Sequence, residues 1–336
     1  MRIFIMRRPS VPLLFVLFLC LPLLISGETP SPLGGGTDTA PKVPGVSPEL
    51  ILKSYLNSFP EKIKDVSFLQ DDWSIRIEDE TFFWAEGRLL PASLLNGGKN
   101  YAPFDFSPYP DEVPAPELIS QERIKEIYLR DSRELRGNRG EHYYGFQALL
   151  YGGRTRREIE SNLVRSSFLG YSLTIHRDIA ARIARVETAV RKAALSDPET
   201  AAFVKGIGSV GGYNWRDVQG SGNMSYHSWG LAVDIQPKNL NGKSIYWFWE
   251  RSYNKDWMLV PLESRWQPPA AVIKAFEDEG FIWGGKWEQY DNMHFEYRPE
   301  LHELNRLLGA RKQRQDRSAI QDLHHISPYL NALLEK

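Results

Sequence analysis

Two short segments of the sequence alternate strictly between large apolar side chains and small or polar ones. In the first, residues 230–236 (GLAVDIQ), Leu231, Val233 and Ile235 fall on one face of an extended strand. The opposite face carries only small side chains and Asp234. A strand that packs on a core has no need of a carboxylate there. The pattern therefore predicts a shallow surface on which Asp234 meets a ligand.

The second segment, DNMHFEY, repeats this arrangement. Its Met, Phe and Tyr alternate as the core face, so His294 and Glu296 point the other way. His227 lies in the polar run just ahead of the first strand. If both strands belong to one sheet, His227, Asp234 and His294 converge. Two imidazoles and a carboxylate with an open fourth position form the ligand set of a catalytic zinc site, and Asp291 is close enough to reach a zinc-bound water.

These segments resemble the paired motifs of bacterial zinc D-alanyl-D-alanine carboxypeptidases. SYHSWGLAVDI is similar to the family pattern S-x-H-x-x-G-x-A-x-D, and DNMHFEY is similar to D-x-x-H-F-E. The wider family includes vancomycin-resistance dipeptidases and the L-alanyl-D-glutamate endopeptidases of phage endolysins. The resemblance covers residues 206–299. It implies that His227, Asp234 and His294 bind Zn²⁺ and that the substrates are peptidoglycan stem peptides.

The resemblance also implies roles for residues around the metal. Asp291 matches the general base, which takes a proton from the attacking water and later delivers it to the leaving amine. An aspartate in this position is more typical of the endopeptidase branch. GGYNWRDVQG is similar to the family segment that supplies a substrate arginine, here Arg216, which would stabilise the oxyanion. Glu296 is expected to orient a ligand imidazole, and Ser225 to hold nearby backbone or to touch substrate.

Other functions stay open at this point. A non-catalytic wall-binding protein could keep the zinc fold, although the presence of Asp291 favours turnover. The same metal site could also act on a peptide from outside the cell wall. Serine penicillin-binding enzymes are disfavoured, because their S-x-x-K and S-x-N motifs occur here in reversed order and K-T-G is absent. The sequence does not distinguish a carboxypeptidase from an endopeptidase, and it gives no oligomeric state.

The N-terminus has the layout of a secretory signal peptide. Three arginines precede an apolar run (11–25) that ends in small residues, which predicts a signal over residues 1–27. The run is short for a membrane span, so we expect export across the inner membrane, to the periplasm or beyond, with no stable span in the mature chain. The sequence does not distinguish a cleaved signal from one retained as an anchor. Cys20, the single cysteine, lies within this signal. The mature chain must therefore be held together by core packing rather than disulfides.

The rest of the sequence predicts an α+β fold with a small antiparallel sheet flanked by helices. After removal of the signal, 38 basic and 42 acidic residues remain, a net charge of −4, which argues against a nucleic-acid partner. The composition divides the mature chain into four parts. They are a Pro/Gly-rich linker (28–48), an accessory region of unknown role (49–166), a zinc metallopeptidase domain (167–310) and a basic C-terminal helix or tail (311–336).

Local patterns predict individual elements. Alternation over residues 73–91 indicates a hairpin. Thr155 and Glu158 form a capping box, and an apolar stripe from Ile175 to Val190 predicts a helix. Five histidines outside the motifs are expected to be structural: His142, His176, His302, His324 and His325. The aromatic run at 246–257 is expected to be mostly core, with part of it beside the substrate groove.

Overall fold

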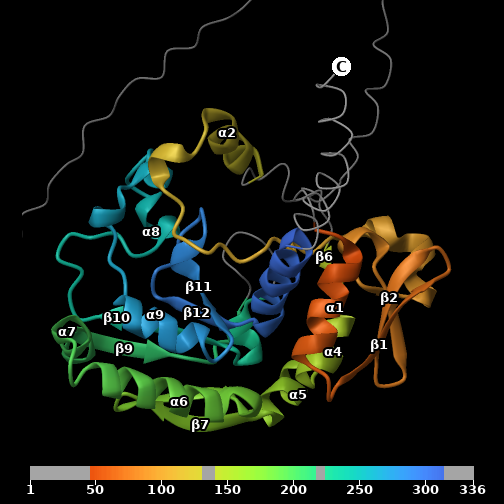
Figure 1. Ribbon diagram of the computed structural model, residues 1–336, viewed down its shortest axis with the longest axis horizontal. Helices are drawn as coiled ribbons and strands as arrows, with labels where there is room; N and C mark the ends of the chain where they lie inside the picture. The colour runs from red at the N-terminus through yellow and green to blue at the C-terminus, as the bar shows by residue number, and fades with distance from the viewer. Residues whose placement is uncertain (1–45, 131–140, 217–223, 314–336) are drawn as a thin grey trace, which may run out of the picture. The chain divides into compact units, whose positions relative to one another are not determined.

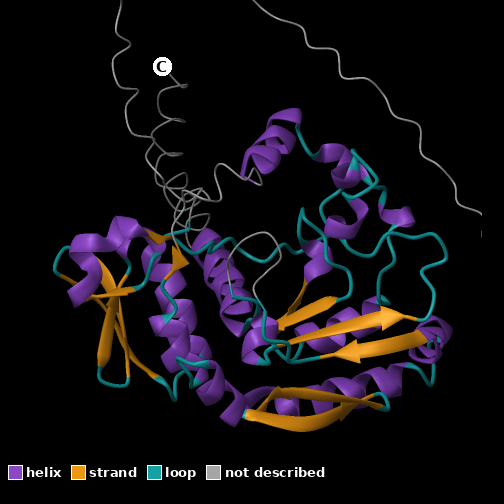
Figure 2. Cartoon of the chain, turned by 180° about the vertical axis from the view of Figure 1, so that it is seen from behind, coloured by secondary structure: helices purple, strands orange, loops and turns teal. Residues whose placement is uncertain are grey.

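The computed structural model describes residues 46–130, 141–216 and 224–313. The expected signal peptide and most of the expected linker lie outside the described residues, as do residues 314–336 of the expected C-terminal tail. Within the described part, the fold is the predicted mixture of helices and small, mostly antiparallel sheets (Figure 1). Figure 2 shows the strands gathered into these separate sheets. No helix among the described residues combines the length and apolarity needed to cross a bilayer.

The accessory region opens with a helix and a four-stranded antiparallel sheet. Ser47 caps the helix by accepting a hydrogen bond from Leu50 N. The hairpin predicted over residues 73–91 is confirmed, and it turns at Glu78, which has a positive φ of 51°. The strands follow the order β1-β2-β3-β4. The bounds are α1 (Pro48–Ser58), β1 (Ile63–Leu69), β2 (Asp72–Ile77), β3 (Glu80–Phe83) and β4 (Leu90–Pro91).

A proline-rich stretch then leads to several short elements. Most of residues 103–115 have no regular structure, as the prolines predict. The capping box is present: Thr155 accepts from Glu158 N, and the Glu158 side chain accepts from Thr155 N at 2.9 Å. The bounds are β5 (Tyr101–Ala102), α2 (Gln121–Arg130), β6 (Glu141–His142), α4 (Gly145–Tyr151) and α5 (Arg156–Ser161).

The predicted long helix begins later than its apolar stripe suggested. Ile175 belongs to a strand rather than to the helix, because the chain stays extended as far as His176. His176 then caps the helix, its Nδ1 accepting from Asp178 N at 3.2 Å. The expected boundary between residues 166 and 167 falls inside β7. The bounds are β7 (Leu163–Phe168), β8 (Tyr171–His176), α6 (Arg177–Ala193) and α7 (Pro198–Gly206).

The second four-stranded sheet is antiparallel throughout and has the order β11-β12-β10-β9. Helix α9 covers one face of this sheet, where Phe276 stacks on Phe295 with ring centroids 4.0 Å apart. Helix α6 packs against α9 (Figure 1). The bounds are β9 (Ile207–Gly211), β10 (Ala232–Pro237), α8 (Trp247–Glu250), α9 (Ala270–Glu277), β11 (Phe281–Trp283) and β12 (His294–Tyr297). A further helix covers residues 299–313.

The accessory region and the second sheet share one apolar core. The Phe59 ring packs edge-on against the Tyr297 ring at 6.4 Å, and the Tyr151 ring lies 5.6 Å from the Trp229 ring. Buried side chains from α1, β2, α4, α6, α9 and β12 all belong to this core. The residues before 167 are therefore part of the framework that holds the second sheet.

Candidate metal centre

The turn before β10 positions the first histidine. Ser225 caps a 3-10 turn, η4 (Tyr226–Trp229), and its Oγ accepts from His227 N at 3.3 Å. Gly230 ends the turn with φ +68°, a conformation that favours glycine. A Cβ on Gly230 would lie 2.8 Å from His176 N. The first motif thus encodes a capped, tightly packed turn that directs His227 toward the sheet, and Ser225 holds the backbone of this turn.

The register of the sheet brings the other two ligand candidates together. Asp234 on β10 is the direct cross-strand partner of His294 on β12, and Ala232 pairs with Glu296. Residues opposite each other in an antiparallel pair project to the same face. The alternation predicted from sequence is therefore confirmed, and the small side chain of Ala232 leaves room beside the carboxylates.

His227, Asp234 and His294 converge on one point. Asp234 Oδ1 lies 3.1 Å from His227 Nε2 and 2.9 Å from His294 Nδ1, and the two ring nitrogens are 3.2 Å apart. Bond lengths of 2.0–2.2 Å in a tetrahedral zinc site place neighbouring ligand atoms about 3.4 Å apart. The three contacts are close to the edges of such a tetrahedron. The donor set thus fits a tetrahedral metal ion such as zinc.

Hydrogen bonds behind the two imidazoles fix which nitrogen faces the centre. His227 Nδ1 lies 2.6 Å from the carbonyl oxygen of Gly212, an acceptor, so Nδ1 carries the proton and Nε2 offers its lone pair. His294 Nε2 lies 3.1 Å from Glu296 Oε2, which leaves Nδ1 facing Asp234. Such outer partners orient metal ligands in many proteins. Glu296 therefore lies within hydrogen-bond distance of the His294 imidazole, and its role in orienting a metal ligand stays a prediction.

Buried charges around the centre balance one another. Burial favours protonation of Asp234, but His227 and His294 outweigh it and hold the pKa of Asp234 well below its usual range. Burial acts on Glu296 in the same way, and the hydrogen bond from His294 together with the charge of Arg298 lowers the pKa of Glu296. Arg298 NH1 lies 3.1 Å from Glu296 Oε1. Both carboxylates are therefore held ionised.

Asp291 is the exception among these acids. The residue is half-buried, and its Oδ1 is buried with no hydrogen-bond partner among the described residues. Burial raises the pKa of Asp291 to about 7, and the negative charge of Asp234 acts in the same direction. His294 and Arg216 oppose the shift. A carboxyl group with a pKa near neutrality and a free oxygen has the properties of a general base.

Arg216 lies at the rim of the centre. Its NH2 is 3.8 Å from Asp234 Oδ2, and its side chain is 44 % exposed. Ser228, which follows His227, pins the backbone here: its Oγ accepts from Arg216 N at 2.9 Å and donates to Arg216 O at 2.6 Å. The guanidinium is thus placed where it can meet a substrate carbonyl. No sequence pattern indicated the role of Ser228.

Two glycines outside the predicted site hold the centre in place. A Cβ on Gly212 would collide with the Thr174 carbonyl oxygen, and the Gly212 carbonyl is the acceptor for His227. A Cβ on Gly284 would lie 2.6 Å from the carbonyl oxygen of Asp291. The roles of both glycines depend on contacts with residues distant in sequence, and no local sequence pattern reveals such contacts. Paired glycines in GGY and WGGKW are the only available signals.

Trp287 was also missed, although it lies beside the centre. Its ring centroid is 5.6 Å from that of His294. Trp287 and Glu296 line a cavity of about 530 Å³, which residues of the proline-rich stretch also line. The aromatic run at 246–257 is mixed rather than mostly core: Trp257 is buried, whereas Tyr253 is 74 % exposed.

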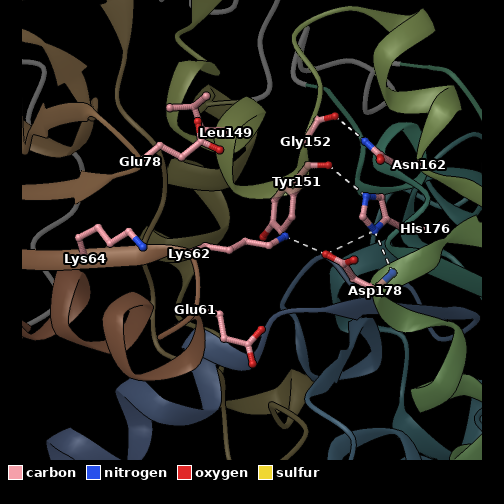
Figure 3. A pocket seen from close by; sticks show the side chains of 10 residues that line it. All are labelled: Glu61, Lys62, Lys64, Glu78, Leu149, Tyr151, Gly152, Asn162, His176 and Asp178. Carbon is pink, nitrogen blue, oxygen red and sulfur yellow. Dashed lines mark hydrogen bonds and ion pairs between the residues drawn. The ribbon is translucent and has the colours of Figure 1, made fainter.

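The remaining histidines have structural partners where they are described. His142 Nδ1 donates to the Ala102 carbonyl, and His302 Nε2 to that of Phe281. His176 lines a separate cavity of about 280 Å³, where its Nε2 donates to the Tyr151 carbonyl and Lys62 Nζ lies 2.8 Å from Asp178 (Figure 3). The polar groups joined in this cavity satisfy each other. His324 and His325 lie outside the described residues.

Comparison with known families agrees with this geometry. Residues 219–297 match the model of a family described as D-alanyl-D-alanine carboxypeptidase. The matched segment contains all three ligand candidates and Asp291, whereas Arg216 precedes it. Residues 51–106 match a domain of unknown function, DUF8518. No solved structure matches the chain. The resemblance predicted from the two motifs is confirmed, and the segment that carries the metal centre is related to a peptidase family.

Proposed function

We propose that this protein is an exported zinc metallopeptidase that hydrolyses peptidoglycan stem peptides. One observation carries the proposal: His227, Asp234 and His294 meet at zinc-like spacing, with Asp291 beside them, inside the segment that matches the carboxypeptidase family. Export rests on the signal-like N-terminus. Substrates of the cell wall are supported by that export and by the family description.

In the proposed reaction, each candidate site residue has a distinct role. His227, Asp234 and His294 would hold the metal, which supplies Lewis-acid polarisation and an acidified water when bound. Asp291 accepts the proton of the attacking water and returns it to the leaving amine, which its near-neutral pKa allows in both directions. Arg216 stabilises negative charge on the attacked carbonyl oxygen. The centre lies between the sheet and the η4 turn, where the negative charge that Arg216 neutralises is buried. Its charges therefore interact in a low-dielectric setting.

A mass spectrum of purified pentapeptide muropeptides tests this function. The mature protein is incubated with the muropeptides with and without a chelator. Chelator-sensitive loss of one terminal alanine identifies a carboxypeptidase, and release of the peptide between L-Ala and D-Glu identifies an endopeptidase. Spectra that stay unchanged while zinc is bound would refute the proposal and leave a binding protein or a substrate from outside the wall.

A further inference from the structure

A cavity of about 240 Å³ lies behind the metal centre, between the accessory region and the second sheet. Its lining is mainly aromatic, with side chains from both regions: Tyr55, Phe104, Tyr144, Tyr151, Tyr226 and Trp229. Tyr226 and Trp229 flank His227 on η4. Glu296, which lies 3.1 Å from His294, also lines the cavity. The cavity is therefore a direct neighbour of the candidate metal ligands.

The cavity offers no uncompensated positive charge. Arg298, which lines it, forms ion pairs with Glu296 at 3.1 Å and with Glu300. The same guanidinium lies over the Tyr226 ring, 4.8 Å from its centroid. An anionic ligand would have to displace one of these carboxylates. The lining therefore favours an uncharged ligand with an apolar face.

One polar group in the lining lacks a partner. Gln147, on α4, is only 7 % exposed, and its Oε1 has no hydrogen-bond partner among the described residues. Buried polar atoms in native proteins are nearly always paired, and leaving one unpaired is unfavourable. A ligand that brings an N–H group into the cavity would satisfy this acceptor. A purely aliphatic ligand would leave it unpaired.

We infer that this cavity binds the N-acetylated sugar that carries the stem peptide. An N-acetylhexosamine combines the required features: one ring of suitable size, an apolar face for the aromatic side chains and an amide N–H for Gln147. The inference rests on the proposed function, since the metal centre would act on the peptide attached to that sugar. In this arrangement the accessory region supplies most of the sugar subsite.

The position of the cavity also favours one end of the stem peptide for cleavage. An extended stem pentapeptide spans roughly 17 Å, so a sugar next to the metal centre places the first peptide bonds there and the terminal alanine far away. Among the bonds at the sugar end of the stem, the bond between L-Ala and D-Glu is the expected target, because it is the one that the endopeptidases resembled by this sequence cut. This agrees with the aspartate at position 291, which is more typical of endopeptidases.

The test compares two substrates, the disaccharide pentapeptide and the free pentapeptide, with the zinc-loaded mature protein. We expect kcat/KM to be at least about tenfold higher for the disaccharide substrate. Phe104→Ala and Gln147→Leu should each reduce that ratio toward one. Phe68→Ala serves as the matched control, because Phe68 is 57 % exposed on β1 and does not line the cavity.

Other outcomes either overturn the inference or are resolved by a binding measurement. A wild-type ratio of one, or a ratio that both cavity variants retain, overturns it. An equal fall for both substrates would show that the cavity binds peptide rather than sugar. If neither substrate is cleaved, the proposed function fails, and calorimetric titration with the free disaccharide then tests the subsite alone. Binding that Phe104→Ala abolishes supports the subsite, and absence of binding to the wild type overturns it.

Discussion

Asp291 has a buried carboxyl group with one unpaired oxygen, and this state makes a specific prediction about catalysis. Asp291→Asn keeps the size of the side chain but removes the base. We expect metal content to stay at the wild-type level while kcat falls about 10²- to 10⁴-fold. Metal analysis and muropeptide kinetics measure the two quantities. Asp256→Asn, at an exposed position, should change neither. Wild-type turnover by the Asp291 variant would exclude it as the base.

The raised pKa of Asp291 also predicts a pH dependence of stability in the metal-free protein. Burial raises this pKa to about 7, whereas an aspartate in an unfolded chain titrates near 3.9. The folded chain thus keeps a proton that the unfolded chain has lost. The resulting stabilisation is complete below about pH 4 and is lost as the pH rises through 7, with a slope of at most about 1.4 kcal/mol per pH unit.

Denaturant unfolding of the metal-free wild type and of Asp291→Asn from pH 4 to 8 measures this contribution. The difference in unfolding free energy between the two proteins should fall across this interval. Added zinc should reduce the pH dependence, because a nearby cation favours the carboxylate. Parallel profiles for the two metal-free proteins would show that Asp291 does not titrate as its burial predicts.

The ligands themselves are tested by loss of the metal. His227→Ala or His294→Ala removes one of three protein ligands, so zinc binding and turnover should be lost together. His302→Ala is the control, since His302 donates to a carbonyl on β11 and does not belong to the cluster. Zinc titration followed by calorimetry gives the affinities. Retention of wild-type affinity by both ligand variants would place the metal elsewhere.

At the scale of elements, the hydrogen bond behind His227 depends on the close approach of β9 to β8. Gly212→Ala would push the chain away from the Thr174 carbonyl and shift the acceptor for His227 Nδ1. We expect zinc affinity to fall about 10- to 100-fold with the fold retained. Gly206→Ala provides the control, because a Cβ there meets nothing within 4 Å. Equal affinities in the two variants would show that this hydrogen bond does not tune the ligand.

Sequence patterns predicted the helices and strands well where residues close in sequence determine the conformation. The capping box at Thr155 and the two ligand strands were predicted because their signals lie within a few residues. Ile175 was misassigned because a strand residue next to a helix can share the face of its apolar stripe. Only the packing of β8 against β7 makes it extended. The roles of Gly212 and Gly284 depend on contacts distant in sequence and gave no local signal.

At the scale of the whole molecule, the accessory region and the second sheet form one core. Asn57 Nδ2 donates to Glu303 Oε1 at 2.6 Å, and the Tyr109 hydroxyl donates to Glu277 at the same distance. Contacts between such distant residues have no periodic signature, so the sequence indicated only an accessory region of unknown role. A shared core makes the matched peptidase segment dependent on residues that lie outside the match.

This shared core predicts cooperative unfolding. Residues 46–313 should unfold in a single transition, with tryptophan fluorescence and circular dichroism giving the same midpoint. Deletion of residues 28–162 should leave a chain that does not fold, since it exposes the apolar side chains that α1 and α4 cover. Two separate transitions, or a folded deletion variant with bound zinc, would show that the regions are independent.

The central claim is that His227, Asp234 and His294 hold a metal that the reaction requires. The most direct measurement is a titration of the metal-free mature protein with zinc while the cleavage of purified muropeptides is followed. We predict no cleavage without zinc, and a rate that rises and saturates at one zinc per chain. Cleavage by the metal-free protein, or saturation with zinc that produces no cleavage, would contradict the account.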